Sequence, residues 1–254
     1  MTGFARYPSL ADKTVIITGG GSGIGAAMVE AFAAQGAKVA FLDIAEEPSR
    51  ALVEALRDAK HKPVFYPNDV SQTDELKRTI AQIGQDLGPA SVLVNNAAND
   101  DRHEIDDVDE AYWDWSMNVN LRHHFFAAQA VRPQMRELGG GSIINFSSVT
   151  WFWGPANLAI YTTAKAGVVG LTRSLARAFG DDQIRVNAVV PGAVRTERQI
   201  TLWNTKESHD AIAQRQMIKR TLMPDDLART VLFLAADDSA MITRQDITVD
   251  AGLR

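Results

Sequence analysis

The chain has 254 residues, of which 46% are hydrophobic and 22% are charged, as is ordinary for a globular protein. It contains no cysteine, which excludes disulfides, zinc–thiolate sites and a thiol nucleophile. The net charge of −5, without a long basic run, argues against nucleic acid or an anionic membrane as the main partner. We expect no secretory signal in residues 1–13 and no run of about 18 apolar residues that would span a membrane, and therefore a cytoplasmic protein.

Short apolar runs alternate with longer amphipathic segments along the chain. The predicted strands are residues 14–18, 38–43, 63–69, 91–98, 142–148, 185–192 and 246–250. The predicted helices are residues 24–36, 48–59, 73–86, 110–136, 157–179 and 225–236. Residues 193–223 are polar, and we expect an irregular segment there, whose length is typical of a functional lid.

This alternation of strand and helix predicts an α/β protein. Strands that are apolar on both faces belong in a parallel sheet with helices on each side, which is a doubly wound, Rossmann-type fold. The sequence has no Pro/Gly/Ser-rich linker, no break in composition and no internal repeat. We therefore expect residues 1–254 to form one domain.

Residues 18–25, TGGGSGIG, place five glycines where the first strand gives way to the first helix. Glycines at a helix N-terminus allow a pyrophosphate to approach the free backbone N–H groups. The spacing is not G-x-G-x-x-G, and Ala26 and Ala27 stand where the loop of nucleotide triphosphatases needs Lys and Ser or Thr. A plain flexible turn is the alternative, but the flanking strand and helix favour a dinucleotide site.

Asp43 ends the second predicted strand. A carboxylate there can accept hydrogen bonds from the adenosine ribose and would repel the 2′-phosphate of NADP. Neither Ser22 nor Ile44 supplies the cation that NADP would need. We therefore expect NAD as the cofactor; the alternative for Asp43 is a capping role in the next turn.

Tyr161 and Lys165 are four residues apart on a predicted helix and so share one face. Ser148 ends the preceding predicted strand, at the sheet edge where doubly wound folds hold their ligands. Since the pKa of a tyrosine phenol is about 10, its pKa must be lowered before it can act as a base at neutral pH. A neighbouring ammonium and a cationic nicotinamide both favour the phenolate, and Ser148 can hold the substrate oxygen.

These motifs together resemble those of the short-chain dehydrogenase/reductase family over nearly the whole chain. The matching elements are TGGGSGIG (18–25), Asp69-Val70, NNAA (95–98), Asn120 in VNL, Ser148, YTTAK (161–165) and PGAVRT (191–196). The chain departs from the family pattern at Ala98, where glycine is usual, at TRQ (243–245) and at DAG (250–252).

The resemblance implies a role for each matched residue. Tyr161 would be the general base, and Lys165 would lower its pKa and hold the nicotinamide ribose. Ser148 would orient the reacting hydroxyl, and Asn120 would anchor a water in a proton relay. The resemblance also implies a homotetramer. We expect no metal site. The residues expected to bind NAD are Gly19, Gly21, Ser22, Gly23, Ile24, Asp43, Ile44, Asp69, Val70, Asn96, Ala97, Ala98, Tyr161, Lys165, Pro191, Gly192, Val194 and Thr196.

The positions that face substrate in this family are polar here, with aromatic walls. They are residues 99–103, Thr150, Trp151, Trp153, Asn157, Arg198, Gln199 and Trp203. A sugar needs directional donors and acceptors and a flat apolar face, whereas a steroid or acyl chain needs an aliphatic lining. A solvated turn at 100–103 and tryptophans in the core are the plainer alternative. We expect sugar contacts from Asn99, Asp100, Ser148, Trp151, Asn157, Tyr161 and Gln199.

Several longer segments, among them NAANDDRH (96–103) and AYWDWSMNVNLRH (111–123), are similar to bacterial family members that act on D-xylose, with relatives acting on L-arabinose and L-fucose. The implied reaction oxidises the anomeric C1 hydroxyl of an aldose to an aldonolactone. One alternative is an NADP-linked 3-oxoacyl reductase, which predicts a more apolar pocket. Another is a catalytically silent NAD-binding regulator, against which the intact Asn120, Ser148, Tyr161 and Lys165 argue.

Overall fold

A parallel sheet of seven strands forms the centre of the described chain. The computed structural model describes residues 3, 5–203 and 205–253. The strands are β1 Thr14–Thr18, β2 Lys38–Asp43, β3 Val64–Pro67, β4 Ala90–Asn95, β5 Gly141–Phe146, β6 Ile184–Pro191 and β7 Asp246–Val249. Their order is β3-β2-β1-β4-β5-β6-β7, and every neighbouring pair is parallel. The predicted doubly wound α/β fold is therefore confirmed.

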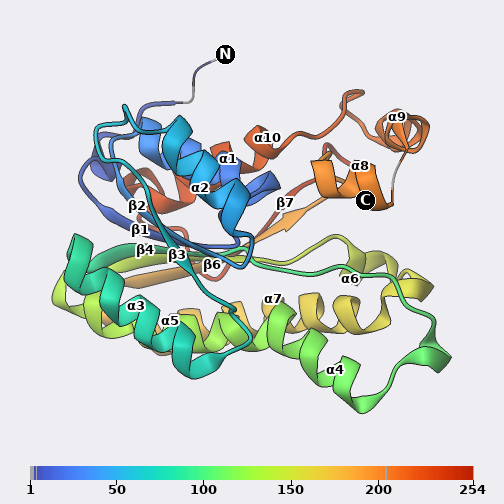
Figure 1. The fold of residues 1–254 in the computed structure, drawn as a ribbon, viewed down its shortest axis with the longest axis horizontal. Coiled ribbons are helices and arrows are strands. Elements are labelled where there is room, and N and C mark those ends of the chain that lie inside the picture. Colours follow the sequence, from blue (N-terminus) through green and yellow to red (C-terminus); the bar gives the residue numbers. More distant parts are fainter. Residues whose placement is uncertain (1–2, 4, 204, 254) are drawn as a thin grey trace.

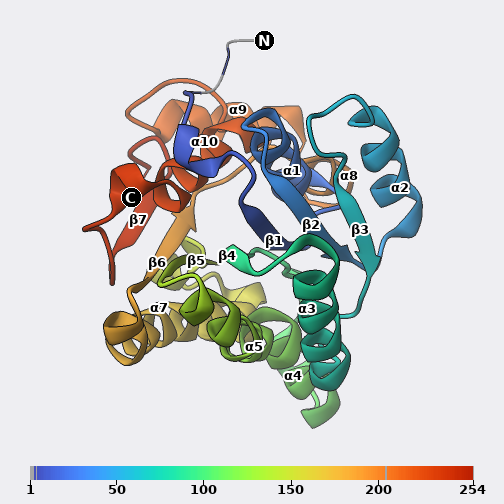
Figure 2. The same cartoon turned by 90° about the vertical axis from the view of Figure 1, so that its left-hand side faces the viewer.

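Helices cover both faces of this sheet (Figure 1). On one face lie α1 Gly23–Ala34, α2 Glu46–Ala55 and α10 Pro224–Ala235. Figure 2 shows α3 Thr73–Leu87, α5 His123–Glu137 and α7 Ala159–Phe179 on the other, with α4 Glu110–Met117 below them. The short helices are η1 Pro8–Leu10, η2 Ile105–Asp107, α6 Thr150–Trp153, η4 Ala156–Leu158, η5 Gly180–Asp182, α8 Glu197–Leu202, α9 Lys206–Arg215 and η6 Asp237–Ser239.

The core is split by the sheet into two layers, because successive side chains of a strand point to opposite faces. All five residues of β1 are buried. Val15 and Ile17 pack into the layer that holds Phe32 of α1, whereas Ile16 packs into the layer that holds Ile80 of α3. None of the described helices is long and apolar enough to cross a membrane.

The structure refines one prediction of secondary structure and corrects another. Residues 110–136 lie in one unbroken helical run, as predicted, but a π-helical turn, η3 Asn118–Arg122, stands within it between α4 and α5. Residues 193–223 are not irregular throughout, since they contain α8 and α9. Both of these helices begin at a threonine N-cap, where the hydroxyls of Thr196 and Thr205 accept hydrogen bonds from the amides of Gln199 and Ser208.

The strand ends also fall earlier than predicted on the fourth and fifth strands. β4 ends at Asn95 and β5 at Phe146, so Ser148 lies in the loop beyond its strand. Asp43 does end β2, as predicted. Because all strands are parallel, these carboxyl ends meet at one edge of the sheet, and the connections that leave them lie close together.

Candidate active site

A cavity of about 1390 Å³ lies at the carboxyl edge of the sheet. Its walls come from the turn between β1 and α1, the ends of β2, β4, β5 and β6, the start of α7, and α8. Figure 1 shows α6, α8 and α9 gathered at the same end of the molecule. The edge that doubly wound folds use for ligands is therefore hollow here.

The glycine turn forms one end of the cavity and needs its glycines. Gly19 and Gly23 have φ values of 67° and 53°, in the left-handed region that residues with a Cβ rarely adopt. A Cβ on Gly25 would overlap the carbonyl oxygen of Gly19. The N-cap Ser22 makes no side-chain bond to the start of α1. The helix therefore begins beside the cavity without a side-chain cap, an arrangement that fits an anionic phosphate.

Asp43 lines the cavity next to this turn. Its Oδ2 accepts a hydrogen bond from the Gly21 amide at 2.8 Å, and its Oδ1 accepts one from the Ala45 amide at 2.9 Å. Asp43 therefore does cap the neighbouring turns. This capping does not exclude a second role, since an ionised carboxylate can accept about four hydrogen bonds and only two are used here.

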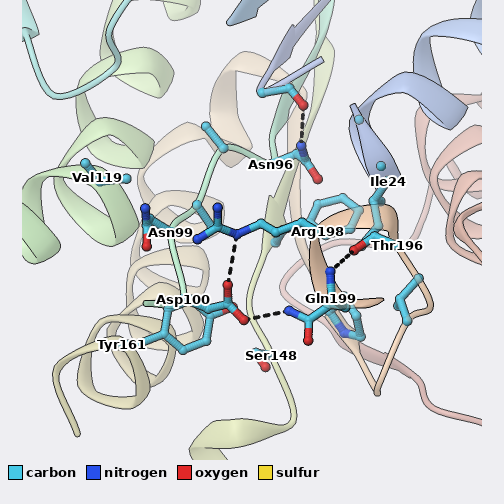
Figure 3. A pocket seen from close by; sticks show the side chains of 18 of the residues that line it. Ile24, Asn96, Asn99, Asp100, Val119, Ser148, Tyr161, Thr196, Arg198 and Gln199 are labelled. Atoms are coloured by element: carbon cyan, nitrogen blue, oxygen red, sulfur yellow. Dashed lines mark hydrogen bonds and ion pairs between the residues drawn. The ribbon is translucent and has the colours of Figure 1, made fainter. Parts of the chain in front are cut away.

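Asn96 connects the end of β4 to the glycine turn. Its Nδ2 donates to the carbonyl oxygens of Thr18 at 3.1 Å and Gly19 at 2.9 Å (Figure 3). The Thr18 hydroxyl in turn accepts hydrogen bonds from the amides of Asn96 and Ala97. These bonds fix the turn against the central strand pair before any ligand is bound.

Tyr161, Ser148 and Lys165 line the same cavity. The Ser148 hydroxyl lies within hydrogen-bonding reach of the Tyr161 phenol and also accepts from the Thr150 amide at 3.2 Å. Lys165 is 1% exposed, and its Nζ donates to the Phe146 carbonyl at 3.0 Å, 5.5 Å from the centre of the Tyr161 ring. The predicted face of the helix therefore points at Ser148 as expected.

The free site opposes ionisation of Tyr161. Burial raises the pKa of this phenol above its ordinary value, and the charge of Asp100 raises it further, against smaller opposite effects of Ser148 and Arg102. Burial also lowers the pKa of Lys165 to about 7, with Asp100 acting in the opposite direction. A phenolate in this cavity therefore needs a further positive charge beyond those that the chain provides.

Asn120 lies behind the cavity rather than in its wall. It is fully buried in the π-helical turn η3. Its Oδ1 accepts from the Asn99 amide at 2.9 Å, and its Nδ2 donates to the Asn99 carbonyl at 3.0 Å and to Ser116 Oγ at 3.2 Å. The side chain thus holds the backbone of Asn99 in place, and π-helical turns of this kind are frequent at functional sites.

The end of the cavity opposite the glycine turn is polar. Asp100 meets Arg198 and Gln199 of α8 there (Figure 3). Three partly exposed tryptophans also line the cavity: Trp115 is 38% exposed, Trp153 47% and Trp203 36%. Flat aromatic faces beside directional polar groups are the combination that a sugar requires.

The cavity gathers nearly all of the residues predicted from the sequence. Of those residues, the following are not part of its wall: Gly21, Asp101, His103, Asn120 and Trp151. The indole nitrogen of Trp151 is buried, and its ring packs on Phe152 with centroids 3.7 Å apart. Trp153, two residues further along, takes the aromatic position in the wall. The residues of the wall that the sequence interpretation missed include Trp115 and Val119, whose only signal is that they precede Asn120 in the same helical run.

Comparisons with known proteins agree with this architecture. The family model described as enoyl-(acyl carrier protein) reductase matches residues 19–254. D-xylose 1-dehydrogenase of Caulobacter vibrioides is 50% identical over 250 residues, which cover 98% of this chain and 99% of that protein. The probable galactose dehydrogenase GalD of Rhizobium meliloti is 49% identical, covering 98% of each chain.

More distant relatives carry other activities on the same fold. The 3-oxoacyl-[acyl-carrier-protein] reductase FabG of Thermotoga maritima is 36% identical, over 96% of this chain and 98% of that protein. The crystal structure of a putative gluconate dehydrogenase from Agrobacterium tumefaciens superimposes with a TM-score of 0.91 at 28% identity, covering 98% of each chain. The matched model, the relatives and the motifs agree, and the chain belongs to the short-chain dehydrogenase/reductase family.

Proposed function

We propose that the protein is an NAD-dependent dehydrogenase that oxidises the anomeric C1 hydroxyl of a pentose or related aldose to the aldonolactone. D-xylose is the first candidate, followed by L-arabinose and L-fucose. One observation carries the proposal: a single cavity joins the glycine turn, Tyr161 and a polar end with exposed tryptophans. The two relatives that are about half identical are a D-xylose 1-dehydrogenase and a probable galactose dehydrogenase, which supports a sugar as the substrate.

The residues of the cavity fit NAD. The uncapped start of α1, with Gly23 in a left-handed conformation, leaves room for the pyrophosphate at the turn. Asp43 has acceptor capacity left for ribose hydroxyls and a charge that opposes a 2′-phosphate. Val194 and Thr196 line the cavity beside the catalytic group, where the carboxamide of the nicotinamide would lie.

When bound, NAD supplies the acceptor for the hydride of C1 and a positive ring charge. Tyr161 accepts the proton of the C1 hydroxyl at its phenolic oxygen. Ser148 would hold the same substrate oxygen by a hydrogen bond, and Lys165 would hold the nicotinamide ribose. Asn120 fixes the Asn99 backbone, which keeps the loop at the sugar end in place. Residues 193–223, with α8 and α9, serve as the lid over the sugar.

The other two functions fit less well. A 3-oxoacyl reductase would need an apolar tunnel, whereas Asp100, Arg198 and Gln199 line this end of the cavity. A silent NAD-binding regulator would have no use for the complete set of Ser148, Tyr161 and Lys165 in one cavity.

The test is absorbance of the reduced cofactor during turnover with a panel of substrates and both cofactors. The panel contains D-xylose, L-arabinose, L-fucose, D-galactose, xylitol and a 3-oxoacyl thioester. We expect turnover of at least one aldose with NAD and slower turnover with NADP. Methyl β-D-xyloside is the matched control, since its anomeric oxygen carries no proton and it should be inert. Failure of every aldose, or turnover of the blocked glycoside, would contradict the proposal.

A further inference from the structure

The lid helix α8 has no core of its own. None of its described residues is buried, and its N-terminus is set by the Thr196 cap. A six-residue helix of this kind is not stable by itself, so contacts with the rest of the molecule must hold it in position. The segment that meets α8 is the loop of residues 99–103, of which Asn99, Asp100 and Arg102 line the same cavity.

Three polar contacts cross from this loop to the lid. Arg198 Nη2 lies 2.6 Å from Asp101 Oδ1, and Arg198 Nε lies 3.4 Å from Asp100 Oδ1. Gln199 Nε2 donates to the second oxygen of Asp100 at 2.7 Å (Figure 3). One residue beyond α8, the Trp203 ring lies 5.1 Å from the guanidinium of Arg102.

The two sides are complementary in chemistry. The loop contributes two carboxylates and one guanidinium, while the lid contributes one guanidinium, one amide and one aromatic ring. Asp100 is 17% exposed, whereas Asp101 and Arg198 are 44% and 45% exposed. Exposed ion pairs are weak, and the more enclosed bond to Asp100 is stronger. Contacts of this strength hold a lid in place yet let it open at every turnover.

We propose that Asp100, Asp101 and Arg102 form a latch with Arg198, Gln199 and Trp203, which closes α8 over the sugar. Arg198 and Asp101 are then positioning residues, because they hold the lid without touching the reacting atoms. Asp100 and Gln199 bond to each other and are also expected to contact the sugar. That the bound molecule is a sugar rests on the proposed function, whereas the contacts between the loop and α8 do not depend on it.

Closure of the latch has a chemical purpose. Tyr161 and Ser148 lie in the cavity that the lid covers. Excluding water from this space strengthens the hydrogen bonds that hold the sugar. An open latch therefore weakens sugar binding and leaves the cofactor end of the cavity unaffected.

Hydrogen exchange tests the latch without any substrate. Arg198→Gln and Asp101→Asn are expected to raise exchange of the α8 amides by roughly two- to five-fold, the range of an exposed ion pair. Arg215→Gln is the matched control, since it removes the same charge from an exposed position of α9 outside the cavity wall. Unchanged exchange in both latch variants, or an equal rise in the control, would overturn the latch.

Kinetics of the intact enzyme supply the second test. Both variants should raise KM for the aldose by roughly two- to five-fold, with kcat and the Kd of NAD unchanged. The double variant should resemble Arg198→Gln alone, because the two residues act through one contact. Effects that multiply, or a parallel loss of NAD binding, would overturn the proposal. If no aldose reacts but exchange responds as expected, the latch stands and the proposed substrate falls.

Discussion

Tyr161 lies in an environment that keeps its phenol neutral. Burial and the nearby carboxylate of Asp100 both raise the pKa of this phenol. The Nζ of Lys165 donates one of its hydrogen bonds to the Phe146 carbonyl. A base with such a high pKa would be inactive at neutral pH without added positive charge. Activation of the base is therefore expected to depend on the cofactor, which couples proton removal to a filled cofactor site.

The variant Tyr161→Phe tests this residue directly. We expect kcat to fall by roughly 10²–10⁴-fold, because the ring is kept and the proton acceptor is lost. NAD should still bind, as measured by a fluorescence titration. Tyr66→Phe is the control, since Tyr66 lies on β3, outside the cavity wall, and its hydroxyl donates a hydrogen bond to Asp86 of α3. Loss of NAD binding in Tyr161→Phe would show that its role is misassigned.

Helix α5 carries a buried pair of histidines at its start. His123 and His124 are 1% and 0% exposed, and their ring centroids are 4.2 Å apart. Burial lowers the pKa of His123 to about 3, and the charge of Lys165 adds to this effect. Burial lowers the pKa of His124 as well. In the unfolded chain both rings have their ordinary pKa, so they bind protons at pH values at which the rings of the folded chain stay neutral.

This difference predicts a pH-dependent stability. Between pH 6.5 and about 3 the unfolded state binds more protons at His123, so the free energy of unfolding falls as the pH falls. His123→Leu should remove about 1.4 kcal/mol of this loss per pH unit in that window. Urea titrations of both proteins at several pH values measure the difference. Parallel pH profiles for the variant and the parent chain would contradict the assignment.

The elements that the sequence predicts well are those with a strong apolar period. β1 and α1 were predicted within two residues, because all five β1 residues are buried and glycine marks the turn. The π-helical turn at 118–122 was not predictable, since it depends on the tertiary bonds of Asn120 to Asn99. The helix α8 was missed because no buried residue gives it an amphipathic pattern.

The candidate site divides in the same way. Gly19, Ser148 and Tyr161 belong to motifs whose spacing follows from the sheet topology, and they do line one cavity. Trp151 was predicted in the wall and is not there, because the short helix α6 turns its indole inward and presents Trp153 instead. Orientation within a four-residue helix follows from packing, which the sequence alone does not reveal.

The cavity joins the two halves of the sheet. Asp43 and Val70 come from the β2 and β3 side, while Pro191 and Gly192 come from the end of β6 on the opposite side of β1. A ligand that contacts both sides binds the folded chain and not the unfolded one. Its binding energy is therefore added to the stability of the whole molecule.

Thermal unfolding measures this effect and the choice of cofactor together. NAD at 100 times its Kd should add about 2.7 kcal/mol and raise Tm by roughly 5–10 °C. NADP at the same concentration should give a smaller rise, because Asp43 opposes its 2′-phosphate. An equal or larger shift with NADP would contradict the assignment of NAD. The comparison needs no sugar and so is independent of the substrate.

The absence of buried residues from α8 affects how the sequence of this protein can change during evolution. A helix without buried side chains can exchange its residues at little cost in folding free energy, since no packed atoms are displaced. The sheet and the glycine turn, in contrast, tolerate few changes. The sequence at the cofactor end of the cavity can therefore be conserved while the sequences of α8 and residues 99–103 change. A lineage can move from one sugar to another without passing through an ancestor that fails to fold.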